Sequence, residues 1–231
     1  GFLNKSLPSY LILFVNNICQ LRCDMCFYWD SMQVKTTQMT LEEIEKLAKS
    51  LPNLLQLTLT GGEPSLRKDL PEIPKIFSTH SNLSKCTVVT NGMLCERIRD
   101  QVYKFVTENP TVDFRMSISM DAVGDLHDKI RGVKGSFKKA EKTLNLLFKI
   151  RDEVPNLWVD VNTTISKYNC EEFESIHNHI ITNYPVDNHV CGFTRGNTKE
   201  ADAKEIPIEY YTKAKALIAK TRKLRKHPFQ K

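Results

Sequence analysis

The chain has 231 residues, of which 41% are hydrophobic and 26% are charged, and its formal net charge at pH 7 is +6. This balance is that of an ordinary globular protein, and the length suits one domain with a substantial core. No apolar run approaches the roughly 18 residues that a membrane-spanning helix needs, and we find no leader of the signal-peptide kind, so we expect no membrane span.

The first predicted element is a buried strand at residues 10–15, and a cluster of cysteines follows it. Cys19, Cys23 and Cys26 form the pattern C-x3-C-x2-C, with an aromatic residue, Phe27, directly after it. Three thiolates from one loop can hold three corners of a cubane iron–sulfur cluster, which leaves the fourth iron open to an outside ligand. A zinc site is the alternative, although structural zinc normally takes four ligands and no histidine precedes His80.

Strand and helix patterns then alternate along the chain. Thr40 to Glu43 form a capping-box pattern at the start of a helix that Pro52 ends, and Gly61-Gly62 ends the second strand. The further predicted strands are residues 54–60, 86–90, 112–120, 157–165 and 186–193. The further predicted helices are residues 69–79, 95–107, 136–154, 171–183 and one that begins near Pro207. Residues 121–135, which contain three glycines, are predicted to form a loop.

Six strand-then-helix units in succession favour a parallel sheet with right-handed crossovers. A full eight-unit barrel takes about 250 residues, so six units and their extensions use up this chain. The predicted fold class is therefore α/β, a partial (β/α)6 TIM-type barrel with a parallel sheet and outer helices. We expect residues 1–195 to form the core domain and residues 196–231 to form a basic helical extension packed on it.

Three of the predicted strands have polar residues at one parity and apolar residues at the other. Successive strand residues face opposite sides, so we expect the polar set to line the concave face. Each such group would cost roughly 1–3 kcal/mol if it were left unpaired in a dry interior, so this face must be wet or filled by a polar ligand. The polar set comprises Gln56, Thr58, Thr60, Ser117, Ser119, Asp121, Asp160, Asn162 and Thr164.

The cysteine pattern and the turn Gly61-Gly62-Glu63-Pro64 together resemble the radical S-adenosylmethionine (radical SAM) enzymes, which carry a GGEP motif one strand after the cysteines. Three further stretches are similar to family motifs: Thr90-Asn91-Gly92, the strand end at Ser119 to Asp121, and the run from His127 to Gly132. The likeness covers nearly the whole chain and is greatest to the branch of the molybdenum-cofactor A and pyrroloquinoline-quinone E proteins.

The resemblance implies a [4Fe-4S] cluster on Cys19, Cys23 and Cys26, and S-adenosyl-L-methionine that is cleaved reductively to methionine and a 5′-deoxyadenosyl radical. The cofactor-binding residues predicted in this way, together with the polar strand pattern, are Phe27, Gly61, Gly62, Glu63, Ser119, Arg131 and Asn162. A small-molecule or peptide substrate and a reductant such as flavodoxin or ferredoxin are the expected partners. A non-catalytic scaffold that binds the cluster or S-adenosylmethionine, and a zinc-binding α/β module, are the alternatives.

Other features bear on the setting and the substrate. The four cysteines outside the cluster are scattered, which favours a reducing, cytoplasmic protein over a disulfide framework. The basic run from Lys213 to Lys231 is interpreted as a solvated helix face and not as a nucleic-acid contact. Cys191 and Arg195 are candidates for contact with a substrate. His177, His179 and His189 show no ligand spacing, and we expect them to be core or surface residues and not metal ligands.

Overall fold

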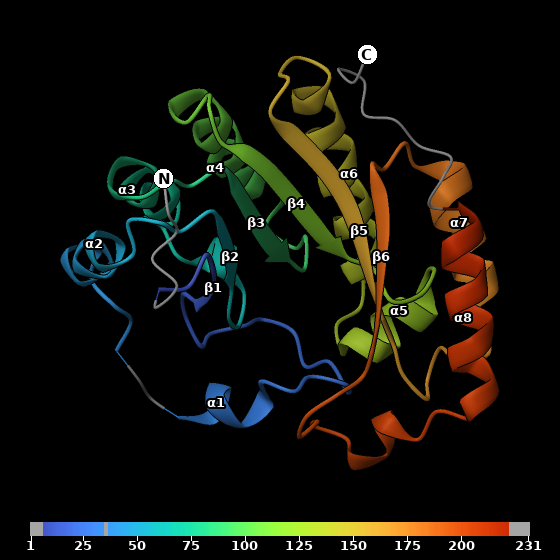
Figure 1. Cartoon of the computed structure of the whole chain (residues 1–231). Coiled ribbons are helices and arrows are strands. Elements are labelled where there is room, and N and C mark those ends of the chain that lie inside the picture. Colours follow the sequence, from blue (N-terminus) through green and yellow to red (C-terminus); the bar gives the residue numbers. More distant parts are fainter. Residues whose placement is uncertain (1–6, 35–36, 222–231) are drawn as a thin grey trace.

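The computed structural model describes residues 7–34 and 37–221, which form one curved sheet of six parallel strands with helices on its outer side (Figure 1). The strand order in space is the strand order in the chain, so each crossover leads to the neighbouring strand. β1 and β6 are the two edges of the sheet. This confirms the predicted partial barrel. The strands are β1 (Tyr10–Phe14), β2 (Gln56–Thr60), β3 (Lys85–Thr90), β4 (Asp113–Ser119), β5 (Leu157–Ile165) and β6 (Asn188–Phe193).

The long helices lie close to their predicted positions. They are α2 (Leu41–Ser50), α3 (Glu72–His80), α4 (Cys95–Glu108), α6 (Ser136–Arg151), α7 (Phe173–Asn183) and α8 (Ile208–Thr221). The capping box of α2 is present: the Glu43 amide donates to Thr40 Oγ1 at 3.2 Å, and the Thr40 amide donates to Glu43 Oε2 at 2.8 Å. One short helix, α1 (Trp29–Gln33), follows the cysteines, and 3-10 turns occupy Pro64–Leu66 and Ala201–Lys204.

The prediction of a loop over residues 121–135 was wrong in its middle, where the chain forms the helix α5 (Asp125–Arg131). Gly132 ends this helix in the left-handed conformation, with φ of 71°. The carboxylate of Asp128 then accepts hydrogen bonds from the amides of Gly135 and Phe137 and from the Ser136 hydroxyl, at the start of α6. Asp128 therefore joins α5 to α6.

The strand residues whose side chains point to the outer side of the sheet form the core under the helices. Six of its residues are at most 2% exposed, and burial of each such side chain contributes about 1.5–3 kcal/mol to folding. They are Leu57, Leu59, Met116, Ile118, Val159 and Val161. The alternate strand residues, which face the concave side, include most of the predicted polar set. Two of that set depart from the prediction: Gln56 is exposed, and Asp121 is fully buried among protein partners.

Helix α8 packs beside β6 and α7. Ala214 of α8 shares an apolar cluster with Phe173, and the Tyr211 ring stacks on Phe193 with centroids 3.9 Å apart. Residues 222–231, which carry much of the predicted basic run, lie outside the described residues. The division into a core of residues 1–195 and an extension of residues 196–231 remains a prediction. Among the described helices, none combines the length and the apolar character that crossing a bilayer requires.

Candidate functional site

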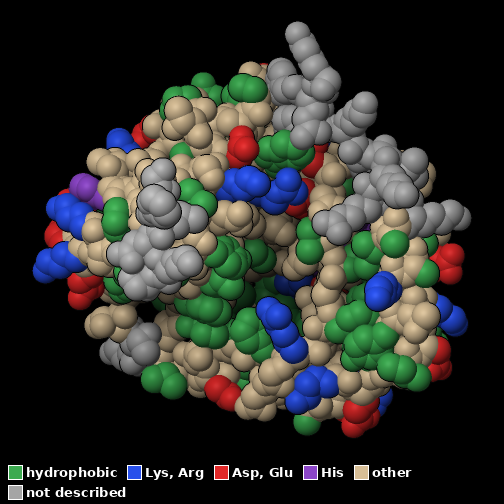
Figure 2. All heavy atoms as spheres, viewed as in Figure 1, with side chains coloured by type: hydrophobic (Ala, Val, Ile, Leu, Met, Phe, Trp, Pro, Cys, Tyr) green, Lys and Arg blue, Asp and Glu red, His purple; other side chains and the backbone are tan. Residues whose placement is uncertain are grey.

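The concave side of the sheet borders a cavity of about 780 Å³. Figure 2 shows the hollow near the centre of this face, with hydrophobic side chains inside and Lys and Arg side chains beside it. Pockets of roughly 300–1,000 Å³ are typical of cofactor and substrate sites. All ten residues predicted to bind metal or cofactor line this one cavity: Cys19, Cys23, Cys26, Phe27, Gly61, Gly62, Glu63, Ser119, Arg131 and Asn162.

The cysteine loop is held by backbone hydrogen bonds from two sides. The amides of Arg22 and Asp24 donate to the carbonyls of Arg131 and Ile130 at the end of α5, at 3.1 and 3.0 Å. From the segment after β6, the Lys199 amide donates to the Cys26 carbonyl at 3.1 Å. The position of the three thiols is therefore fixed by segments more than 100 residues away in the chain.

The three thiols are free and partly buried. Burial raises the pKa of all three, and raises that of Cys23 to about 12, while the nearby positive charge of Arg131 acts in the opposite direction. Thiolates in this site therefore need further positive charge, which iron would supply if bound. Three sulfur donors on one loop, facing a cavity, fit a cluster that keeps one iron free of protein ligands.

The paired glycines after β2 are needed where this turn meets the segment before the first cysteine. A Cβ on Gly61 would lie 2.3 Å from the Asn16 carbonyl oxygen, and one on Gly62 would lie 2.2 Å from that of Ile18. The amides of Gly62 and Glu63 donate to these same two oxygens at 2.9 and 2.7 Å. The glycines therefore bring the turn against the backbone that leads into Cys19.

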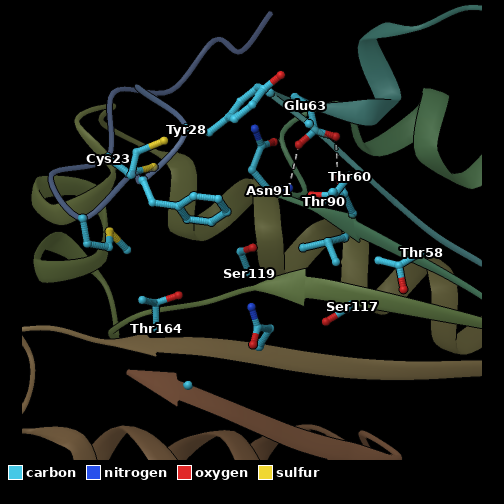
Figure 3. A pocket seen from close by; sticks show the side chains of 18 of the residues that line it. Cys23, Tyr28, Thr58, Thr60, Glu63, Thr90, Asn91, Ser117, Ser119 and Thr164 are labelled. Atoms are coloured by element: carbon cyan, nitrogen blue, oxygen red, sulfur yellow. Dashed lines mark hydrogen bonds between the residues drawn. The ribbon is translucent and has the colours of Figure 1, made fainter. Parts of the chain in front are cut away.

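Glu63 is 1% exposed, and its carboxylate accepts four hydrogen bonds. The donors are the amide and hydroxyl of Ser65, the hydroxyl of Thr90 and the amide of Asn91, at 2.6 to 3.1 Å. Figure 3 shows Glu63 beside Thr90 and Asn91 at the edge of the cavity. Asn91 in turn donates through Nδ2 to Cys19 Sγ at 3.7 Å. Glu63 thus joins the ends of β2 and β3 next to the first cysteine.

Arg131 lies between the cysteines and the end of β4. Its Nε donates to Asp121 Oδ2 at 2.6 Å, and Asp121 Oδ1 accepts the Thr164 amide at 2.8 Å. No described residue accepts a hydrogen bond from the two Nη groups of Arg131, which borders the cavity. The guanidinium is therefore oriented by an ion pair and still presents donors to a ligand.

His127 contacts Asp121 on the side away from the cavity. It is fully buried, and its Nδ1 accepts the Asp121 amide at 3.1 Å. Burial lowers the pKa of His127 to about 4, and the positive charge of Arg131 adds to this effect. The ring is therefore neutral at pH 7, and the motif from His127 to Gly132 is a unit that positions Asp121, Arg131 and the cysteine loop.

The walls of the cavity between β4 and β5 are polar. Ser119 pairs in register with Asn162, and Ser117 with Asp160. Figure 3 shows Ser117, Ser119 and Thr164 on this side of the space, opposite Tyr28 and Glu63. Phe27 is half exposed, and its Cβ lies 3.2 Å from where a Cβ on Gly196 would stand.

Arg115 is a charged residue of the cavity wall that was not predicted from the sequence. Arg115 donates through Nη1 to Asp160 Oδ2 at 2.5 Å, and its guanidinium lies 5.0 Å from the centre of the Trp158 ring. Both Arg115 and Asp160 line the cavity, and Asp160 is fully buried. The sequence pattern could have identified it, because Arg115 lies two residues before Ser117 on the same strand and therefore faces the same side of the sheet as Ser117 and Ser119.

The two substrate candidates differ in position. Arg195 borders the cavity and is exposed. Cys191 borders the cavity along the edge strand β6. It pairs in register with Thr163, one of the β5 residues that face the outer side of the sheet, so its side chain faces that side too. Its side chain packs against the apolar cluster that contains Cys170 and Phe173. This placement counts against Cys191 as a hydrogen-atom donor to a ligand in the cavity.

Comparisons with known proteins give a consistent result. The sequence model of the Radical SAM superfamily matches residues 13–180. The sporulation killing factor maturation protein SkfB of Bacillus subtilis is 29% identical over 180 residues, which are 76% of this chain and 40% of that protein. A GTP 3′,8-cyclase of Vibrio atlanticus is 28% identical over 139 residues, which are 56% of this chain and 42% of that protein.

Among solved structures, SuiB of Streptococcus suis bound to its precursor peptide SuiA superposes with a TM-score of 0.68 at 17% identity, over 93% of this chain and 47% of that one. The same protein has been solved bound to S-adenosylmethionine. The chain spans less than half the length of these relatives.

Proposed function

The chain belongs to the radical SAM superfamily, and from this premise we propose that it binds a [4Fe-4S] cluster, with which S-adenosylmethionine is cleaved reductively to methionine and a 5′-deoxyadenosyl radical that modifies a substrate. The observation that carries the proposal is the meeting of Cys19, Cys23 and Cys26 with the Gly61-Gly62-Glu63 turn at one cavity. A structural zinc site would need four protein ligands and no adjacent cavity.

The chain's own residues would bind and orient S-adenosylmethionine. Arg131 is held by Asp121 and would direct its Nη donors to the carboxylate of the methionyl group. Because the Glu63 carboxylate already accepts four protein hydrogen bonds, we assign it the role of positioning the turn, and we assign the contact with the amino group to the backbone of Gly61 and Gly62.

Ser119 and Asn162, as register partners at the cavity, would contact the ribose. Phe27 would pack near the adenine. The exposed position of Phe27 beside the cavity supports this role, since an aromatic face covers a nucleobase without a need for polar partners. The remaining space, toward Arg115 and Asp160, would receive the substrate.

We propose a peptide or small-molecule substrate, because SuiB was solved with a precursor peptide and a relative that is 28% identical over 139 residues is a GTP 3′,8-cyclase. A flavodoxin or ferredoxin would supply the electron. All seven cysteines are free, which accords with the reducing cytoplasm that we propose as its setting.

The test is anaerobic reconstitution with iron and sulfide, reduction with dithionite, and chromatography for 5′-deoxyadenosine after addition of S-adenosylmethionine. We expect about four irons per chain and formation of 5′-deoxyadenosine. Cys23→Ala should lose both the iron and the product. Cys170→Ala is the matched control, because this thiol is buried in the apolar cluster beside α8 and not in the cysteine loop, and it should retain both.

The outcomes distinguish the candidate functions. Iron and sulfide without 5′-deoxyadenosine would favour a scaffold that binds the cluster without catalysis. Zinc in place of iron and sulfide, lost in Cys23→Ala, would favour the zinc-binding module.

A further inference from the structure

Two histidines and a cysteine meet on the outer side of the sheet, away from the cysteine loop. His177 lies on α7, and His189 and Cys191 lie two residues apart on β6. His177 is 1% exposed and His189 is 6% exposed. One potential ligand atom from each of the three residues lies within 4.8 Å of the other two. Two imidazole nitrogens and a thiolate at this spacing are a common donor set for zinc-type ions.

A chain of hydrogen bonds determines which nitrogen of His189 carries its proton. The Thr163 hydroxyl donates to the Met120 carbonyl at 2.6 Å, and Thr163 Oγ1 lies 2.8 Å from His189 Nε2. Because a hydroxyl has one proton, Thr163 Oγ1 must accept at this second contact, so His189 Nε2 is the donor. The neutral ring therefore has its lone pair on Nδ1, which lies 2.7 Å from His177 Nδ1.

This arrangement matches that of metal-binding histidines. Such a histidine usually donates its second ring N–H to a fixed acceptor, which sets its tautomer and its orientation. In this chain Thr163 is that acceptor and is itself held by a main-chain carbonyl. A simple contact between two core histidines needs no such support on the far side.

We propose that His177, His189 and Cys191 bind one zinc-type divalent ion, at a site distinct from Cys19, Cys23 and Cys26. The ion replaces the hydrogen bond between the two Nδ1 atoms. Both Nδ1 lone pairs and the Cys191 thiolate become ligands, the thiol proton passes to solvent, and the proton of His177 moves to its other ring nitrogen. Water completes a tetrahedral site, so the ion has the open coordination of three protein ligands and one solvent position, and not the closed four-ligand form of structural zinc. The ion links α7 to the edge strand β6, and the proposal does not depend on the reaction in the cavity.

The first measurement uses a variant in which Cys19, Cys23 and Cys26 are all replaced by Ala, so that the loop thiols cannot bind the probe. We expect titration with Co²⁺ to saturate at one equivalent, with the visible bands of tetrahedral cobalt and a thiolate-to-cobalt charge-transfer band. Zn²⁺ should displace the cobalt and raise the melting temperature. Absence of these bands from the folded variant would overturn the proposal.

Further substitutions in this background identify the ligands. Cys191→Ser should remove the charge-transfer band, and His189→Gln should weaken Co²⁺ binding at least tenfold. Cys170→Ser is the matched control, because this thiol belongs to the neighbouring apolar cluster but not to the ligand group, and binding should be unchanged. A charge-transfer band that persists in Cys191→Ser would contradict the assignment.

The unmodified sequence gives an independent result if the triple variant does not fold. After anaerobic loading with iron and sulfide and dialysis against Zn²⁺, elemental analysis should find one zinc per chain in addition to the iron. The same treatment of His189→Gln should find iron but no zinc. Equal zinc in both proteins, or zinc in neither, would refute the site.

Discussion

Replacement of Gly62 by Ala tests whether the turn after β2 positions the first cysteine. The added Cβ would lie 2.2 Å from the Ile18 carbonyl oxygen, 2.5 Å from its carbon and 2.7 Å from its nitrogen. Because all three atoms are main chain, residues 16–18 or the turn must move by about 1 Å to restore ordinary contact distances. Gly62 does not have a positive φ, so the expected effect is steric and not a matter of backbone strain.

The movement would weaken the hydrogen bonds from Gly62 to Asn16 and from Glu63 to Ile18. At about 1 kcal/mol each, we expect a loss of about 2 kcal/mol in the free energy of unfolding. For a chain of this size, that corresponds to a fall of about 4–8 °C in melting temperature. Since Cys19 directly follows Ile18, the iron retained after reconstitution should also fall to less than half.

Circular dichroism and iron analysis on the same samples measure both effects. Gly192→Ala is the matched control, because this glycine also borders the cavity, has no positive φ and has no other group within 4 Å of the place that an added Cβ would take. It should retain the iron and the melting temperature. A Gly62→Ala protein with the full iron content and an unchanged melting temperature would refute the reasoning.

Three further predictions follow from named contacts. Arg131→Lys keeps the charge but loses the planar fork, so equilibrium dialysis should show about tenfold weaker binding of S-adenosylmethionine at unchanged iron content; equal affinity would remove Arg131 from the site. Burial raises the pKa of Asp160 from 3.8 to about 6, so the folded state binds its proton more tightly and stability is lost as pH rises from about 4 to 6. Asp160→Asn lacks this loss, and its free energy of unfolding relative to the natural sequence should rise by about 2 kcal/mol between pH 4 and pH 7 in urea titrations; a constant difference would contradict the shift. Thr40→Ala removes the cap of α2 and should cost about 1 kcal/mol in the same assay, with no change in iron content.

Local patterns in the sequence were sufficient for most of the fold. Strand β5 begins and ends at the predicted residues, and the Thr40 capping box marks the start of α2. Helix α5 was missed because it has only seven residues between glycines, and its one apolar pair at helical spacing, Leu126 and Ile130, is too short a pattern to identify a helix. Its stability comes from contacts that Asp128 and His127 make outside the helix.

The site was predictable where a motif names its residues and not where distant segments meet. The residues that the cysteine pattern and the GGEP turn name all line one cavity. The sequence could not reveal that Gly61 and Gly62 face the backbone of residues 16–18, about 45 positions earlier, because that contact depends on the pairing of β1 with β2. For the same reason, the approach of His177 to His189 across α7 and β6 could not be predicted.

The central claim is that the three-cysteine loop leaves one iron open to S-adenosylmethionine, and electron paramagnetic resonance of the reduced, reconstituted protein tests it most directly. Addition of S-adenosylmethionine labelled with ¹⁵N at its amino group should shift the cluster signal and give a resolved nitrogen coupling in electron–nuclear double resonance. A cluster signal that S-adenosylmethionine leaves unchanged, with no coupling to the label, would show that no iron accepts S-adenosylmethionine and would contradict the claim.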